Sequence, residues 1–101
     1  MVEGPRAVIW APTAVADLDE VLAQRDDASG LLEAVLDAAD SLSTFSHRGR
    51  LAPELDDAVT RELFVRDFRL MYEVSSTHVL IVAFVHGRRN FETWRRDRTG
   101  G

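Results

Sequence analysis

Three residues of different chemical type could act together on a phosphodiester. Glu54 follows a proline in a long irregular stretch, Arg69 lies in an alternating segment, and His86 follows the longest apolar run of the chain. Metal-free cleavage of RNA needs a base for the ribose 2′-hydroxyl, a cation for the phosphorane and an acid for the leaving oxygen. A carboxylate, a guanidinium and an imidazole can supply these roles, and an imidazole titrates near neutral pH.

Each of these three residues also has a structural interpretation. Arg69 can pair with Glu62 or Glu73, because opposite charges on neighbouring strands commonly attract each other. A single histidine at a strand end is often structural, and the step Pro53-Glu54 can simply set the shape of a loop. The catalytic and the structural interpretations both stay open at this point.

The residue types that are missing exclude other chemistries. Cysteine is absent, which excludes disulfides, thiolate nucleophiles and cysteine-ligated metal sites. His47, His78 and His86 are too scattered to suggest a metal triad. Of the six glycines only the last two are adjacent, so no phosphate-cradling glycine loop exists. We expect no metal and no cofactor.

The charge is divided unevenly along the 101 residues. All twelve basic residues are arginines; residues 1–43 hold two of them against nine acids, and residues 44–101 hold ten against eight, which recovers the net charge of -5. A general nucleic-acid binder has a basic pI, whereas this chain has a pI near 5.1. Any contact with a polyanion is therefore expected in the second half.

The strongest basic cluster lies near the C-terminus. It could meet nucleic acid or an acidic protein surface, with a solvated tail as the alternative. Trp94 could stack on a base, although such a tryptophan more often packs on its own domain. Arg48 and Arg50 could add phosphate contacts from the long loop. The cluster consists of Arg88, Arg89, Arg95, Arg96 and Arg98.

The first half of the chain predicts one strand and a helical hairpin. Residues 7–10 are apolar and end before Pro12, which indicates a strand. Thr13 and Ser29 are the expected caps of two helices. Apolar residues at helical spacing predict the buried stripes Ala14, Leu18, Val21 and Leu22, and then Leu31, Leu32, Val35, Leu36, Ala39 and Leu42.

The second half predicts three strands after an irregular stretch, residues 43–59, whose length suggests a functional loop. Residues 60–66 and 68–74 alternate around Asp67 as a tight hairpin would. Residues 79–85 are apolar throughout and predict a central strand. Arg69 is expected opposite Phe68 and Leu70, on the uncovered side of the sheet. The last strand is expected to place Val79, Ile81, Ala83 and Val85 on one face, and Leu80, Val82, Phe84 and His86 on the other.

These elements predict an α+β protein in the order β-α-α-β-β-β. The helical hairpin would cover one face of a mostly antiparallel four-stranded sheet and leave the other face free. We expect a single domain over residues 1–96 and a disordered tail over residues 97–101. The apolar stretch before Pro12 is too short for a signal peptide, and no apolar run approaches the roughly 18 residues of a membrane helix, so we expect a cytoplasmic protein without membrane contact.

The chain resembles the RelE/ParE superfamily of toxins from type II toxin–antitoxin modules. The resemblance spans residues 7 to about 96 and depends on the order and spacing of motifs that are individually weak. The motifs are Val8-Ile-Trp-Ala-Pro-Thr-Ala14 with Asp17-Leu18, Gly49-Arg-Leu-Ala-Pro-Glu-Leu55, Arg61-Glu-Leu-Phe-Val65, Phe68-Arg-Leu-Met-Tyr72 and Val82-Ala-Phe-Val-His-Gly-Arg-Arg89.

The resemblance implies one of two activities. RelE-like members cut messenger RNA on the ribosome without a metal, and Glu54, Arg69 and His86 resemble the Glu, Arg and His that some of them use. ParE-like members bind DNA gyrase. The ParE side is favoured, because RelE-like members commonly hold RNA with several lysines and this chain has none.

We therefore predict a growth-arresting toxin that binds DNA gyrase. A ribosome-dependent mRNA endoribonuclease and a decayed toxin that binds only its antitoxin are the alternatives. The expected target contacts are Arg48, Arg50, Arg88, Arg89, Trp94, Arg95 and Arg96. A cognate antitoxin is the expected partner, with an amphipathic helix in an apolar groove formed by the helical hairpin and the sheet edge. A homodimer and a toxin–antitoxin hetero-oligomer both stay open.

Overall fold

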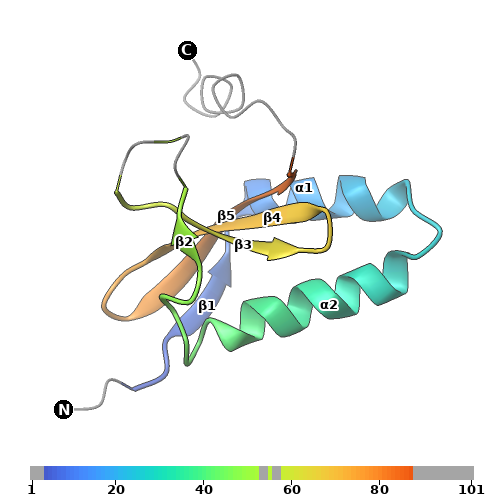
Figure 1. Cartoon of the computed structure of the whole chain (residues 1–101). Coiled ribbons are helices and arrows are strands. Elements are labelled where there is room, and N and C mark those ends of the chain that lie inside the picture. Colours follow the sequence, from blue (N-terminus) through green and yellow to red (C-terminus); the bar gives the residue numbers. More distant parts are fainter. Residues whose placement is uncertain (1–3, 53–54, 56–57, 88–101) are drawn as a thin grey trace.

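Five strands form one mixed sheet in the computed structural model of the chain, which describes residues 4–52, 55 and 58–87 (Figure 1). The sheet order is β1-β5-β4-β3-β2, with β1 parallel to β5 and the other neighbours antiparallel. The predicted α+β class is confirmed, and β2 is an additional strand within the stretch predicted to be irregular. The strands are β1 (Ala7–Trp10), β2 (Arg50–Leu51), β3 (Arg61–Val65), β4 (Phe68–Val74) and β5 (His78–His86).

The helices α1 (Pro12–Ala23) and α2 (Ala28–Ser41) lie on one face of the sheet (Figure 1). Pro12 begins α1 favourably, because the first turn of a helix needs no N–H from it. The expected caps are wrong. The N-caps are Ala11 and Asp27, neither with a side-chain capping bond, since the Asp27 carboxylate accepts hydrogen bonds from arginines instead. Within the described residues, neither helix has the length and apolar character of a membrane span.

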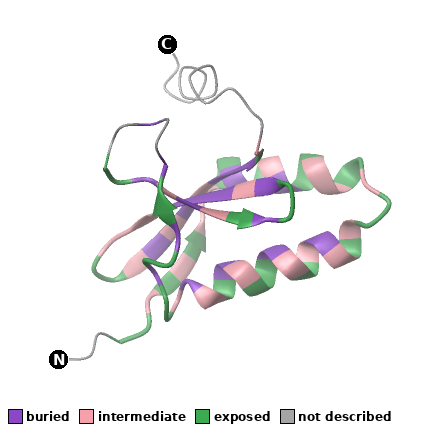
Figure 2. Ribbon diagram, in the orientation of Figure 1, coloured by how far each residue is buried: buried purple, intermediate pink, exposed green. Residues whose placement is uncertain are grey.

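The main core lies between the helices and the sheet (Figure 2). The predicted stripes are largely confirmed: Ala14 and Leu18 are buried from α1, and Leu31 and Val35 are buried from α2. Leu36 is the exception, with 44% of its surface exposed. The sheet contributes Val65, Phe68, Leu70, Tyr72, Val79, Ile81 and Phe84.

A β-bulge at Val82 interrupts the alternation of β5. Tyr72 pairs with Ile81, whereas the preceding Met71 pairs with Ala83, so Val82 is the extra residue. The expectation that alternate residues of this strand share a face throughout is therefore wrong. Val79, Ile81 and Phe84 pack with the helices, whereas Ala83 and Val85 pack on the opposite face.

Two side chains of α1 satisfy the backbone at this bulge. The Asp17 carboxylate accepts a hydrogen bond from the Phe84 N–H at 3.0 Å, and the Thr13 hydroxyl donates to the Val82 carbonyl at 3.2 Å. A bulge leaves backbone groups outside the regular ladder, so these bonds replace the missing strand partners. Thr13 thus serves the bulge rather than the helix terminus for which it was predicted.

The opposite face is not free, contrary to expectation. Ala52 and Leu55, from the segment between β2 and β3, cover Met71, Ala83 and Val85 and form a second, smaller core. Because an exposed apolar sheet face is costly in water, even a short segment that covers it is stabilising. Only part of this face therefore remains for contacts with other molecules.

A close backbone approach fixes β2 against the rest of the sheet. The Gly49 N–H donates to the Tyr72 hydroxyl at 2.8 Å, and the Gly49 carbonyl accepts a hydrogen bond from Arg61 at 2.7 Å. A Cβ at residue 49 would lie 2.5 Å from both the Glu62 carbonyl oxygen and the Tyr72 hydroxyl. Only glycine fits at this position.

Candidate functional site

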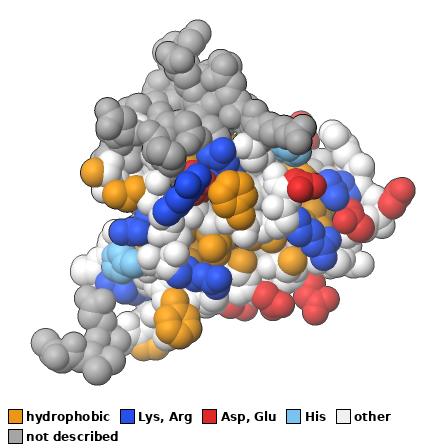
Figure 3. Space-filling view, viewed as in Figure 1, with side chains coloured by type: hydrophobic (Ala, Val, Ile, Leu, Met, Phe, Trp, Pro, Cys, Tyr) orange, Lys and Arg blue, Asp and Glu red, His pale blue; other side chains and the backbone are white. Residues whose placement is uncertain are grey.

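Two arginines flank an exposed phenylalanine on the face opposite the helices. Phe64 of β3 is 52% exposed. The guanidinium carbon of Arg69 lies 5.3 Å from its ring centroid, and that of Arg50 lies 6.0 Å away. Both distances are within cation–π range. Figure 3 shows a hydrophobic group on this face with basic side chains beside it.

A buried carboxylate holds the two arginines. Glu62 is 1% exposed, and its two oxygens accept hydrogen bonds from Arg69 at 3.2 Å and from Arg50 at 3.4 Å. Since a buried carboxylate needs positive partners, Glu62 depends on both arginines as much as it orients them. We call Arg50, Glu62, Phe64 and Arg69 the Phe64 cluster.

Arg69 forms the ion pair with Glu62 that the structural interpretation of this residue predicted. Its side chain is 13% exposed, pairs with Glu62 and also donates to the Gly87 carbonyl at 2.8 Å. Its predicted place opposite Phe68 and Leu70 is confirmed, because those residues pack with the helices. The guanidinium is thus a preorganised cation beside Phe64 rather than a freely extended one.

Arg69 and His86 border the same hollow of about 460 Å³ at one end of the sheet. They reach it from different faces: His86 pairs with Phe68 on the helix side, and its ring meets the Phe68 ring edge-on at a centroid distance of 5.5 Å. His86 therefore lies on the face of Phe84, as predicted, and is exposed. The hollow is lined by Phe64, Arg66, Asp67, Arg69, His86 and Gly87.

An ion-pair network anchors the β3–β4 turn to the start of α2. Asp27 accepts hydrogen bonds from Arg25 at 2.8 Å and from Arg66 at 3.3 Å. The hydrogen bond from Arg25 is the main reason that the pKa of Asp27 is lowered. Arg66 is held in this network with a φ of 55°, a conformation that is unfavourable for a side chain of this size.

Arg48 does not join the Phe64 cluster. It is exposed, donates to the Ser41 hydroxyl at 2.9 Å, and lines a separate hollow together with Arg6. Arg50 is the one predicted loop arginine that reaches the cluster. The other predicted site residues lie outside the described part of the chain: Glu54, Arg88, Arg89, Trp94, Arg95 and Arg96.

Phe64 was missed as a functional candidate, although the sequence contained its signal. The alternation over residues 60–66 places Glu62 and Phe64 on one face of their strand, and Arg69 pairs directly with Phe64 in the sheet. Chemically the cluster offers an aromatic face and oriented cations, which suit an anionic or planar group on a partner.

Two helices on one face of a mixed sheet form the small α+β fold that the sequence motifs suggested. The model of the family described as "ParE toxin of type II toxin-antitoxin system, parDE" matches residues 8–91. The chain belongs to this ParE toxin family.

A solved structure has the same fold. It is titled "Chromosomal ParDE TA system from P. aeruginosa"; it superposes with a TM-score of 0.67 at 17% sequence identity and covers 80% of this chain and 95% of that chain. No curated protein matches the chain.

Proposed function

We propose that this ParE-family chain arrests bacterial growth by binding DNA gyrase, and that a cognate antitoxin restrains it. Membership of the ParE family over residues 8–91 carries the proposal. The Phe64 cluster supports a binding mechanism, because aromatic and arginine side chains that are fixed in place are typical anchors of protein interfaces.

The Phe64 cluster is the proposed target contact within the described residues. Its arginines are already oriented by Glu62, so little conformational entropy is lost when a partner binds. The basic C-terminal residues Arg88, Arg89, Arg95 and Arg96, with Trp94, extend this proposed contact, as does Arg48 from the loop.

A ribosome-dependent endoribonuclease is the second candidate, because Arg69 and His86 border one hollow. Against it, Arg69 is already engaged with Glu62 and the Gly87 carbonyl. His86, the candidate acid, and Arg69, the candidate cation, also reach the hollow from different faces of the sheet. They are therefore less suited to act on one phosphate.

Expression in a bacterial host without the antitoxin separates these activities. Blocked supercoiling with an induced DNA-damage response is expected for gyrase binding, whereas transcripts cut within codons would establish the nuclease instead. If the nuclease operates, Arg69→Ala and His86→Ala should both abolish cutting. A host that grows normally would contradict both activities and leave only a decayed toxin that binds its antitoxin.

A further inference from the structure

The loop between α2 and β2 carries a second surface that the Phe64 cluster does not explain. Phe45 is 65% exposed, the highest value among the large apolar side chains that the structure describes. It lines a hollow of about 330 Å³ with Arg6, Thr44, Ser46, His47 and Arg48. We call Arg6, Phe45, His47, Arg48 and Arg61 the loop patch.

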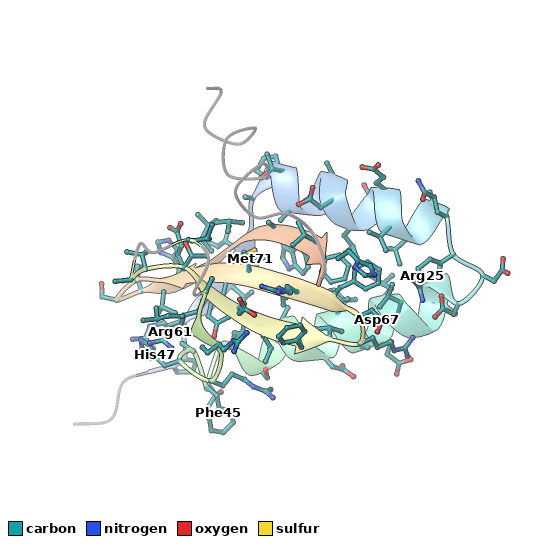
Figure 4. All side chains as sticks on the ribbon, turned by 45° about the horizontal axis from the view of Figure 1, so that its top comes forward. Arg25, Phe45, His47, Arg61, Asp67 and Met71 are labelled. Atoms are coloured by element: carbon teal, nitrogen blue, oxygen red, sulfur yellow. The ribbon has the colours of Figure 1, made fainter. Side chains whose placement is uncertain are left out.

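Arg48 of this loop is joined there by two arginines from other parts of the sequence, Arg6 and Arg61. Arg6 donates to the Ser46 hydroxyl at 3.2 Å, Arg48 to the Ser41 hydroxyl at 2.9 Å, and Arg61 to the Gly49 carbonyl at 2.7 Å. In Figure 4 His47 and Arg61 lie next to each other, and Phe45 points away from the fold. Hydrogen bonds thus hold all three guanidinium groups at this loop, and Arg6 and Arg48 line the same hollow as Phe45.

The local charge opposes that of the whole protein. The chain has a net charge of -5, yet no acidic residue lies between Asp40 and Glu54 in the sequence, and none of the described residues that line the hollow is acidic. The described side chains that line the hollow are therefore neutral or basic, which favours an anion there.

The loop backbone disfavours recognition of an added peptide strand. The Phe45 N–H donates to the Ser41 carbonyl, and the Gly49 N–H donates to the Tyr72 hydroxyl. The carbonyls of residues 42, 43, 47 and 49 also accept hydrogen bonds, from Ser46, Arg6 and Arg61. An added strand needs a row of available backbone groups, so side chains must carry recognition here.

We infer that the loop patch binds single-stranded DNA, with a base stacked on Phe45 and phosphates held by Arg6, Arg48 and Arg61. An aromatic platform beside a basic surface is how proteins hold unpaired nucleotides without reading their sequence. The choice of DNA rests on the proposed function, because gyrase is an enzyme that acts on DNA. The patch would let the toxin touch strands exposed in that complex.

Fluorescence anisotropy of a labelled oligothymidine of about eight nucleotides, at about 50 mM salt, tests this inference with the full chain. Arg48→Gln should weaken binding about tenfold and lower the salt slope by about one. Arg25→Gln, an arginine on the far side of the fold, is the matched control and should bind like the unaltered protein. Phe45→Leu should weaken binding and Phe45→Trp should restore it, because tryptophan keeps a stacking face.

Four results would overturn the inference. They are no binding by the unaltered chain, equal losses in Arg48→Gln and Arg25→Gln, displacement by a poly-glutamate peptide as effective as by oligothymidine, and tighter binding of the matched RNA or duplex. Gyrase binding is measured separately without DNA. Phe45→Leu that loses DNA but keeps gyrase supports the patch, whereas a chain that binds DNA but not gyrase contradicts only the proposed target.

Discussion

The two faces of the sheet are covered by different means. On one face two helices bury a continuous apolar core that includes Leu31, Leu70 and Ile81. On the other face a short segment covers a small core around Met71, and the rest is occupied by an ion-paired cluster around Phe64. The difference indicates that the helix side supplies most of the stability, whereas the opposite side leaves the Phe64 ring exposed between two arginines.

The sharpest test of this division uses two leucines of α2. Leu31 is fully buried, whereas Leu36 is 44% exposed on the same helix. Leu31→Ala should lower the free energy of unfolding by about 3–5 kcal/mol, because it leaves a cavity in the main core. Leu36→Ala should cost less than about 1 kcal/mol, as measured by urea denaturation. Equal losses would show that the helix side is not packed as described.

The carboxylate of the Phe64 cluster should matter next. Glu62→Gln keeps the shape but removes the charge that holds Arg50 and Arg69, so it should destabilise the fold by about 2 kcal/mol. Glu73→Gln, on the neighbouring strand and partly exposed, is the control and should change stability by less than about 0.5 kcal/mol. If both variants unfold at the same denaturant concentration, Glu62 does not anchor the cluster.

Two glycines should respond in opposite directions to alanine. Gly49→Ala places a Cβ against backbone and tyrosine atoms and should cost about 1–3 kcal/mol. Gly30 lies in α2, and its added Cβ would meet only the end of Arg66 at 3.6 Å. Gly30→Ala should therefore stabilise the protein by about 0.5–1 kcal/mol. Thermal unfolding reports both signs, and a stabilising Gly49→Ala would refute the close approach.

The smallest expected effect is the pH dependence of the single tyrosine. Burial raises the pKa of Tyr72 above its usual value of about 10. The folded state then holds the phenolic proton more tightly than the unfolded state, so stability should fall as the pH rises from about 10 through the folded pKa. Ultraviolet titration should place the phenolate midpoint higher in buffer than in urea, and Tyr72→Phe should remove this slope. Identical midpoints would contradict it.

Much of the fold could be predicted because its pattern is local. Helical spacing identified the buried stripes of α1 and α2, and alternation identified the faces of β4. The bulge at Val82 could not be predicted, because the side chains that stabilise it, Thr13 and Asp17, come from an element nearly seventy residues earlier. The helix caps were predicted wrongly for the same reason. The Asp27 side chain pairs with Arg66, which lies far away in the sequence, and makes no capping bond.

The candidate site was predictable only in part. The face of Arg69 followed from alternation, and pairing with Glu62 was one of two interpretations weighed. Arg69 and Arg50 meet beside Phe64 only because β2 pairs with β3. The sequence of the irregular stretch before β3 did not predict that pairing. The position of Arg6 could not be predicted either, because it comes from the acidic first half of the chain yet joins the loop patch.

Inhibition of DNA supercoiling by the purified chain is the most direct test of the central claim. With gyrase, ATP and relaxed plasmid, a molar excess of toxin should abolish supercoiling, and an equimolar cognate antitoxin should restore it. Arg69→Ala should need at least about tenfold more protein for the same inhibition. Undiminished supercoiling with folded toxin in large excess would contradict the proposal that this ParE-family protein acts on gyrase.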